Sequence, residues 1–312
     1  MLKEILAIQT TSYNQFRMFA YIIRRLKEID GVRYYTNNGN IYATRGEGVE
    51  YPCMVSHMDT VHDIVEDLYP FEAYGAITGM NRVTMEQVGI GGDDKVGVYI
   101  TLEMLKRFDV FKVAFFRDEE VGCNGSYLAD MSFFSDCRFV LQCDRKGNSD
   151  FITDASGVQL SSKRFKKDVG KVIERYGYKF ERGMMTDVMA LKQNGIGCSV
   201  ANMSCGYYRP HSHDEYVDIH DVENTLQMCI DIVESCTGSY PHRYEAPTYS
   251  YTAPKAKTNE RAHIVDTYSY DGGWDDYYNR EAEYCIDCWH YPAVEHGMCK
   301  TCLSWYKRNE KF

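Results

Sequence analysis

The sequence predicts an α/β fold in three layers, with helices on both faces of a mostly parallel or mixed central sheet. Short apolar runs alternate with segments whose apolar residues recur at helical spacing along residues 1–238. Such alternation is typical of sheets covered by helices on both faces. With 312 residues and 44% hydrophobic content, the chain can bury one large core and carry a small appendage.

The predicted elements follow in chain order. Residues 15–29 have helical spacing, and residues 32–44 are typical of a hairpin that turns at Asn37-Asn-Gly39. Strands are predicted at residues 52–56, 112–116, 138–143 and 195–203. Amphipathic helices are predicted after the glycine-rich stretch 89–97, over 161–176 and after residue 216.

Acids and histidines follow these strands or lie in loops marked by glycine or proline. They are His57, Asp59, the Asp93-Asp94 pair, the Glu119-Glu120 pair, Asp144 and His211. Strand ends are where a sheet of this kind presents side chains to a ligand. A histidine that binds a metal needs its second ring nitrogen held, usually by a carboxylate. Asp59 is well placed to hold His57 in this way.

The chemistry of these residues indicates a pair of metal ions. The glycines of 89–97 let the backbone approach a metal centre closely, and Asp93 can bridge two cations. Adjacent glutamates repel each other unless cations are near, and one can bind a metal while the other acts as general base. Each cluster alone also fits a solvated turn or a helix cap. Their combined order and placement favour a two-zinc hydrolytic site.

In these motifs the chain resembles the co-catalytic zinc exopeptidases, which include peptidase T, the tetrahedral aminopeptidases and related deacylases and carboxypeptidases. The resemblance runs from about residue 1 to residue 238. It rests on Ser56-His-Met-Asp59, Gly92-Asp-Asp-Lys-Val-Gly97, Glu119-Glu-Val-Gly122 and His211-Ser-His-Asp-Glu-Tyr-Val217. The family implies the same three-layer arrangement.

The resemblance also implies a role for each residue. Two ligand sets are expected to share one aspartate: His57, Asp93 and Asp144 on one zinc, and Asp93, Glu120 and His211 on the other. Glu119 is expected to be the general base, and Asp59 the residue that orients His57. Thr186-Asp187 resembles an element of the aminopeptidase branch, although a helix N-cap explains this pair equally well.

Many relatives carry a large extra domain that this chain has no room for. Only 33 residues separate Asp59 from Asp93, and 66 separate Asp144 from His211. Neither gap can hold a second domain. Residues 1–238 are therefore expected to be a minimal catalytic domain without a lid.

The composition changes after Gly238. Residues 239–283 are rich in Tyr, Pro, Asp and Glu and are predicted to form a flexible linker. Residues 284–312 carry two CxxC knuckles that are predicted to hold one structural zinc through Cys285, Cys288, Cys299 and Cys302. A segment this short needs the metal to fold. Its aromatic residues could also bind a protein partner, which would be a second role of this module.

The predicted function is amide hydrolysis by a metal-dependent aminopeptidase acting on peptides. A deacylase of N-acyl amino acids or a carboxypeptidase could use the same site, and cobalt or manganese could replace zinc. The alternative of another class is a non-catalytic zinc-binding interaction protein, which would be expected to have lost a ligand or the base. His62 and His213 are predicted to be exposed loop residues near the site.

The net charge and the hydropathy of the chain bear on nucleic-acid binding, membrane insertion and cellular location. A formal charge of −10 argues against broad nucleic-acid binding. No apolar run reaches the length of a membrane span, and an acid occurs too early at the N-terminus for a secretion signal. Most of the twelve cysteines lie at apolar or helical positions, which favours reduced thiols. A cytoplasmic location is expected.

Overall fold

The computed structural model describes residues 1–65 and 67–244, and Met1–Tyr244 form one compact unit. Most of the predicted linker and the whole four-cysteine module lie outside the described residues, so these predictions stay predictions. Within the described part of the chain, no helix is long and apolar enough to cross a membrane.

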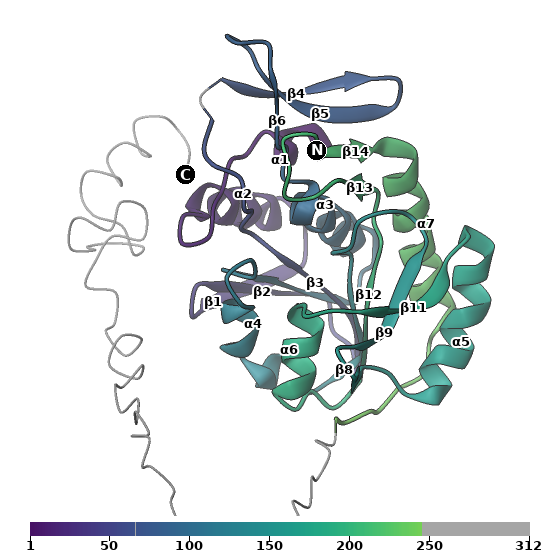
Figure 1. Cartoon of the computed structure of the whole chain (residues 1–312). Helices are drawn as coiled ribbons and strands as arrows, with labels where there is room; N and C mark the ends of the chain where they lie inside the picture. The colour runs from purple at the N-terminus through teal and green to yellow at the C-terminus, as the bar shows by residue number, and fades with distance from the viewer. Residues whose placement is uncertain (66, 245–312) are drawn as a thin grey trace, which may run out of the picture. The chain divides into compact units, whose positions relative to one another are not determined.

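A nine-stranded mixed sheet runs through the unit in the order β1-β2-β7-β3-β8-β12-β9-β10, with β11 paired to β9 (Figure 1). Its strands are β1 (Val32–Asn37), β2 (Asn40–Arg45), β3 (Tyr51–His57), β7 (Phe111–Phe116), β8 (Cys137–Gln142), β9 (Asp150–Ala155), β10 (Val158–Gln159), β11 (Lys179–Gly183) and β12 (Ser199–Met203). Strand β3 is parallel to β7 and β8, and β12 is parallel to β8. The carboxyl ends of these four neighbours therefore lie at one edge of the sheet.

Helices cover both faces of this sheet (Figure 1). One face carries α1 (Leu2–Leu6), α2 (Phe16–Lys27), α3 (Gly92–Arg107), α5 (Lys163–Ile173) and α7 (Ile219–Ser235). The other carries α4 (Asn124–Tyr127), a 3₁₀ turn (Met131–Phe134) and α6 (Asp187–Gln193). Alternate residues of a buried strand serve the two cores: Met54 packs into one and Val55 into the other. The predicted three-layer α/β fold is confirmed.

The predicted helix 161–176 is shorter in the structure. Helix α5 begins after Ser162, whose hydroxyl accepts a hydrogen bond from the Phe165 amide, and it passes into a 3₁₀ turn at Glu174–Tyr176. Ser162 thus caps the helix and satisfies one of its unpaired amides.

A second sheet of five strands was not predicted from the sequence. Its order is β13-β14-β5-β4, with β6 paired to β5. The strands are β4 (Leu68–Ala73), β5 (Ala76–Asn81), β6 (Gln87–Val88), β13 (Tyr207–Tyr208) and β14 (Tyr216–Asp218). The 33 residues between Asp59 and Asp93 thus hold three strands instead of a second domain.

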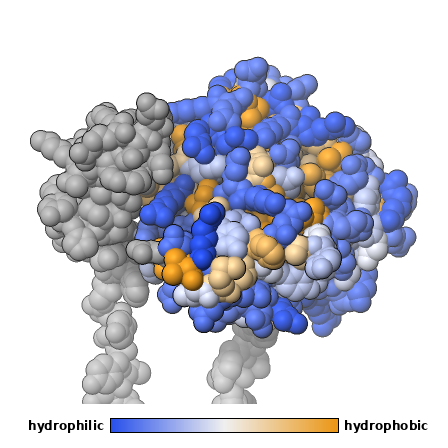
Figure 2. Space-filling model, turned by 90° about the horizontal axis from the view of Figure 1, so that it is seen from above, coloured by the Kyte–Doolittle hydropathy of each residue, from blue (hydrophilic) through white to orange (hydrophobic). Residues whose placement is uncertain are grey.

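The small sheet is part of the same compact unit as the nine-stranded sheet. Its buried residues Ile77, Tyr207 and Val217 belong to the main hydrophobic core. Figure 2 views this end of the molecule from above and shows hydrophobic residues scattered between hydrophilic ones. Pairing of β14 with β5 joins the segment before α3 to the segment that carries His211.

The compact unit continues six residues beyond the predicted boundary at Gly238, to Tyr244. The buried ring of Tyr240 packs against Phe139 and Phe165, with ring centroids 6.1 and 5.1 Å away. The Lys192 ammonium also donates to the His242 carbonyl at 2.9 Å. Residues 239–244 therefore pack as part of the fold.

A chain that ends at Tyr244 is expected to fold, whereas one that ends at Gly238 should lose about 3 kcal/mol or more of unfolding free energy. Removing Tyr240 leaves an unfilled space beside Phe139 and Phe165. Urea unfolding of the two truncated proteins measures the difference, with Tyr240→Ala in the longer protein as the matched control. Equal stability of the two truncations would contradict this packing role.

Candidate metal centre

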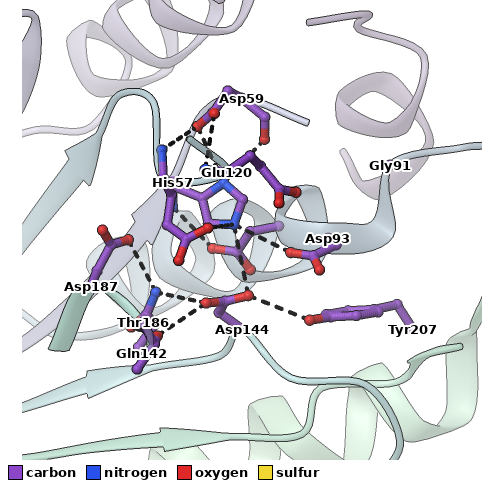
Figure 3. Close-up of polar contacts among 12 residues, drawn as sticks. His57, Asp59, Gly91, Asp93, Glu120, Gln142, Asp144, Thr186, Asp187 and Tyr207 are labelled. Atoms are coloured by element: carbon purple, nitrogen blue, oxygen red, sulfur yellow. Dashed lines mark hydrogen bonds and ion pairs between the residues drawn. The ribbon is translucent and has the colours of Figure 1, made fainter. Parts of the chain in front are cut away.

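The predicted ligands converge where neighbouring parallel strands end (Figure 3). His57 is the last residue of β3, the Glu119-Glu120 pair follows β7, and Asp144 follows β8. Asp93 lies in the first turn of α3. His211 comes from the loop between β13 and β14 and has a left-handed backbone with φ of 61°. Side chains from distant parts of the sequence thus meet at one edge of the sheet.

Two groups of ligand atoms share Asp93. His57 Nε2 lies 3.2 Å from Asp93 Oδ1 and 3.7 Å from Asp144 Oδ1. His211 Nε2 lies 3.4 Å from Asp93 Oδ2 and 3.3 Å from Glu120 Oε2. Within each group the ligand atoms lie within 4.8 Å of one another. Each oxygen of Asp93 therefore faces a different histidine.

The chemistry of these donors fits a pair of divalent cations. Each group offers one imidazole nitrogen and two carboxylates, a donor set that suits zinc and similar ions. Glu120 Oε1 is buried and finds no hydrogen-bond partner among the described residues. A buried carboxylate oxygen without a partner is costly unless a cation or another donor satisfies it. The residues present therefore fit two metal ions.

Crowding of acids shifts their pKa values. Burial, together with neighbouring acids, raises the pKa of Glu119 to about 9 and that of Glu120 to about 8. Burial and the Asp93 charge raise the pKa of Asp144 to about 6. For Asp93 burial acts in the same direction, but hydrogen bonds with His211 and His57 outweigh it and lower its pKa. Positive charge among these groups would favour their ionised forms.

The metal-free protein is expected to lose stability as the pH rises from about 5 to 9. Carboxyl groups with raised pKa values bind more protons in the folded state than in the unfolded state, so their stabilising contribution disappears through this range. Zinc binding at pH 7 should release protons, because the ligands must be deprotonated. Melting temperatures at pH 5 and pH 8, and calorimetry in two buffers of different ionisation enthalpy, measure the two effects. A metal-free protein that gains stability with rising pH would contradict the prediction.

Asp59 contacts both His57 and the turn that carries the two glutamates. His57 Nδ1 lies 3.0 Å from the Asp59 main-chain carbonyl and 3.5 Å from the carboxylate oxygen Oδ1. The carboxylate accepts the Glu119 amide at 2.9 Å, the Glu120 amide at 3.3 Å and the Ser12 hydroxyl at 2.7 Å. The main-chain carbonyl makes the closer contact to the imidazole, and the side chain fixes the glutamate turn.

Asp144 is held by Gln142 and Thr186, of which the sequence singled out only Thr186. Gln142 Nε2 donates to Asp144 Oδ2 at 3.0 Å and to Asp187 Oδ2 at 3.1 Å (Figure 3). The Thr186 hydroxyl lies 2.7 Å from Gln142 Oε1 and 3.2 Å from Asp144 Oδ2, and it can donate its one proton to either acceptor. Thr186 occupies the N-cap position of α6, but its side chain makes no capping hydrogen bond. Its hydroxyl supports a candidate ligand instead.

Two further contacts were not foreseen from the sequence. The thiol of Cys123, which lies in the turn after the two glutamates, donates to Glu119 Oε1 at 3.3 Å. The His62 side chain is only 16% exposed, and its Nε2 lies 2.6 Å from Oε2 of the fully buried Glu215. The expectation that His62 is an exposed loop residue was wrong, because its ring packs against Gly89 and its Nε2 contacts the buried Glu215. His213 is exposed, as predicted.

Known proteins share this architecture. Residues 78–228 match the model of the M42 glutamyl aminopeptidase family. Aminopeptidase PepT from Bacillus cereus has a TM-score of 0.60 at 13% identity, over 76% of this chain and 97% of that one. The TET1 peptidase of Pyrococcus horikoshii has a TM-score of 0.54 at 17% identity, over 74% of this chain and 97% of that one. No individual curated protein matches significantly.

Over residues 78–228 the chain is similar to the M42 glutamyl aminopeptidases, and it shares the fold of the PepT and TET1 structures. The predicted resemblance is confirmed, and with it the assignment as a metal-dependent peptidase of the aminopeptidase type. The part of the chain that matches the M42 model extends from β5 into α7 and includes Asp93, Asp144 and His211. His57 and Asp59 lie before the matched range, and the fold places them beside it.

Proposed function

We propose that this metallopeptidase is an aminopeptidase that removes N-terminal residues from short peptides at two zinc ions. The observation that carries the proposal is Asp93, whose Oδ1 lies 3.2 Å from His57 Nε2 and whose Oδ2 lies 3.4 Å from His211 Nε2. A carboxylate placed in this way is suited to bridging two cations. We assign His57, Asp93 and Asp144 to one ion, and Asp93, Glu120 and His211 to the other. Cobalt or manganese could occupy the same donors.

When bound, the two cations would polarise the substrate carbonyl and lower the pKa of water toward roughly 7. Glu119 is the proposed general base. Its Oε1 accepts the Cys123 thiol proton at 3.3 Å, and its Oε2 lies 3.9 Å from His57 Nε2. One oxygen is thus held while the other faces the candidate ligands.

Glu119 takes a proton from the attacking water and returns it to the leaving amine nitrogen, so that the C–N bond breaks after the new C–O bond forms. Asp59 positions the base, because its carboxylate accepts the Glu119 amide. The His211 side chain is 52% exposed, whereas that of His57 is fully buried. The substrate therefore approaches from the side of His211.

A substrate screen tests the proposed reaction. Zinc-loaded protein is incubated with aminoacyl reporters, with peptides blocked at the N-terminus and with N-acyl amino acids. Cleavage of free-amine reporters alone is expected, and its loss after chelation and in Glu119→Gln would exclude a contaminating peptidase. Cleavage confined to N-acyl amino acids would replace the aminopeptidase by a deacylase. Release of C-terminal residues from blocked peptides would replace it by a carboxypeptidase.

We also propose one structural zinc on Cys285, Cys288, Cys299 and Cys302, with a protein partner as the open second role of that module. The expected result of deleting residues 245–312 is the loss of one zinc per chain with small-substrate turnover retained.

A cytoplasmic location is proposed as well. All eight cysteines of the described residues are buried and unpaired, which supports a reducing compartment.

A further inference from the structure

Glu215 connects the segments that carry the proposed metal ligands. It is fully buried and lies four residues after His211. Its Oε2 accepts hydrogen bonds from the Gly91 amide at 2.7 Å and from His62 Nε2 at 2.6 Å. Its Oε1 accepts the Asp93 amide at 3.2 Å. One carboxylate thus binds the loop after β3, the entrance to α3 and its own loop after β13.

The glycine-rich stretch before α3 leaves room for this contact. A Cβ atom on Gly89 would lie 2.2 Å from two ring atoms of His62. A Cβ atom on Gly92 would lie 3.3 Å from Glu215 Oε1 and 2.7 Å from the Tyr207 side chain. Side chains at these positions would push the imidazole or the carboxylate away. The glycines therefore serve the packing of His62 and Glu215 beneath the loop.

The contact acts on the backbone of Asp93. Figure 3 shows Gly91 and Asp93 on the stretch of chain that enters α3, with the Asp93 carboxylate directed toward His57 and Asp144. Glu215 holds the amides of both Gly91 and Asp93. Holding these amides fixes the point from which the Asp93 side chain extends. The short connection from Glu215 to His211 fixes the second histidine relative to the same point.

We propose that Glu215, supported by His62, is a positioning residue that sets the distance between the Asp93 loop and the His211 loop. Asp93 Oδ1 then faces His57 and Oδ2 faces His211, the two histidines that would hold separate metal ions. The inference rests on the proposed role of Asp93 as the metal bridge. A supporting carboxylate of this kind typically changes metal affinity about 10- to 100-fold when it is lost.

Glu215→Gln in the full-length protein tests the role. The amide has nearly the same volume, but its NH₂ group must face an N–H donor on one side of the former carboxylate. The expected result is about 10- to 100-fold weaker zinc retention in chelator competition. A lower kcat with little change in KM should accompany it. His62→Ala should weaken zinc retention in the same direction, and His62→Gln, which can still donate a hydrogen bond, should restore most of it.

Manganese loading gives a second readout that a merely structural role would not move. Two Mn²⁺ ions joined by a carboxylate are exchange-coupled, and their electron paramagnetic resonance spectrum differs from that of isolated ions. Glu215→Gln is expected to weaken this coupled signal. Glu223→Gln, a change of the same chemistry at an exposed position of α7, should leave zinc affinity and the spectrum unchanged.

The outcomes separate this inference from the proposed function. If the wild-type protein gives a coupled pair and folded Glu215→Gln matches it in spectrum and zinc affinity, the positioning role is overturned and the bridge stands. A lower melting temperature with unchanged zinc affinity and spectrum would also overturn it, because Glu215 would then only support the fold. If the wild-type protein gives no coupled pair, the two-metal proposal itself fails.

Discussion

Glu119→Gln is expected to keep both catalytic metal ions and to lose about 10²-fold or more of its turnover. Glu119 belongs to neither group of ligand atoms, so its substitution leaves all proposed ligands in place. The amide keeps the shape of the side chain but cannot accept the proton of the attacking water. Steady-state kinetics together with elemental analysis of the same sample measure both parts of the prediction.

The adjacent glutamate provides the matched control. Glu120 Oε2 lies 3.3 Å from His211 Nε2, so Glu120→Gln should weaken metal retention, which Glu119→Gln should not. Glu174→Gln, at an exposed position, should change neither property. Near-normal hydrolysis by a fully metal-loaded Glu119→Gln protein would remove Glu119 as the base. Loss of a metal ion from that variant would make it a ligand instead.

The central sheet and the proposed ligands were predictable because their signals are local. A buried strand appears in the sequence as an apolar run. Such a run is followed within a few residues by each of His57, Glu119, Glu120 and Asp144. Parallel pairing of neighbouring strands then brings the strand ends together without further information. The order of histidines and acids along the chain then indicated a site for two metal ions.

The supporting contacts were not predictable because they join residues far apart in the sequence through short elements. Glu215 lies 153 positions from His62 and contacts it because β14, only three residues long, pairs with β5. The strands of the small sheet are two to six residues long and show little alternation of apolar and polar residues. The contact of Cys123 with Glu119 could not be predicted either, because a single cysteine in a turn belongs to no recognisable sequence motif. Sequence located the groups proposed for the chemistry, and tertiary pairing determined what holds them.

Asp93→Ala is expected to impair both catalytic metal sites, whereas Asp144→Ala should mainly affect the site that contains His57. Asp93 is the one residue common to the two groups formed by the proposed ligands. Its removal takes one carboxylate oxygen from each group. Without bound cations, the remaining carboxylates repel one another. Activity should therefore fall to background. Elemental analysis after gel filtration in a weak chelator measures the metal content.

The neighbouring Asp94→Asn variant separates loss of a ligand from damage to the loop. Asp94 is fully buried, and its Oδ2 accepts the His57 amide at 3.0 Å. Burial and the Asp144 charge raise its pKa well above the ordinary value, so an amide resembles the protonated acid it replaces. Asp94→Asn should therefore retain both ions. Two tightly held catalytic ions in Asp93→Ala would exclude Asp93 as the bridge, because each proposed site would then be complete without it.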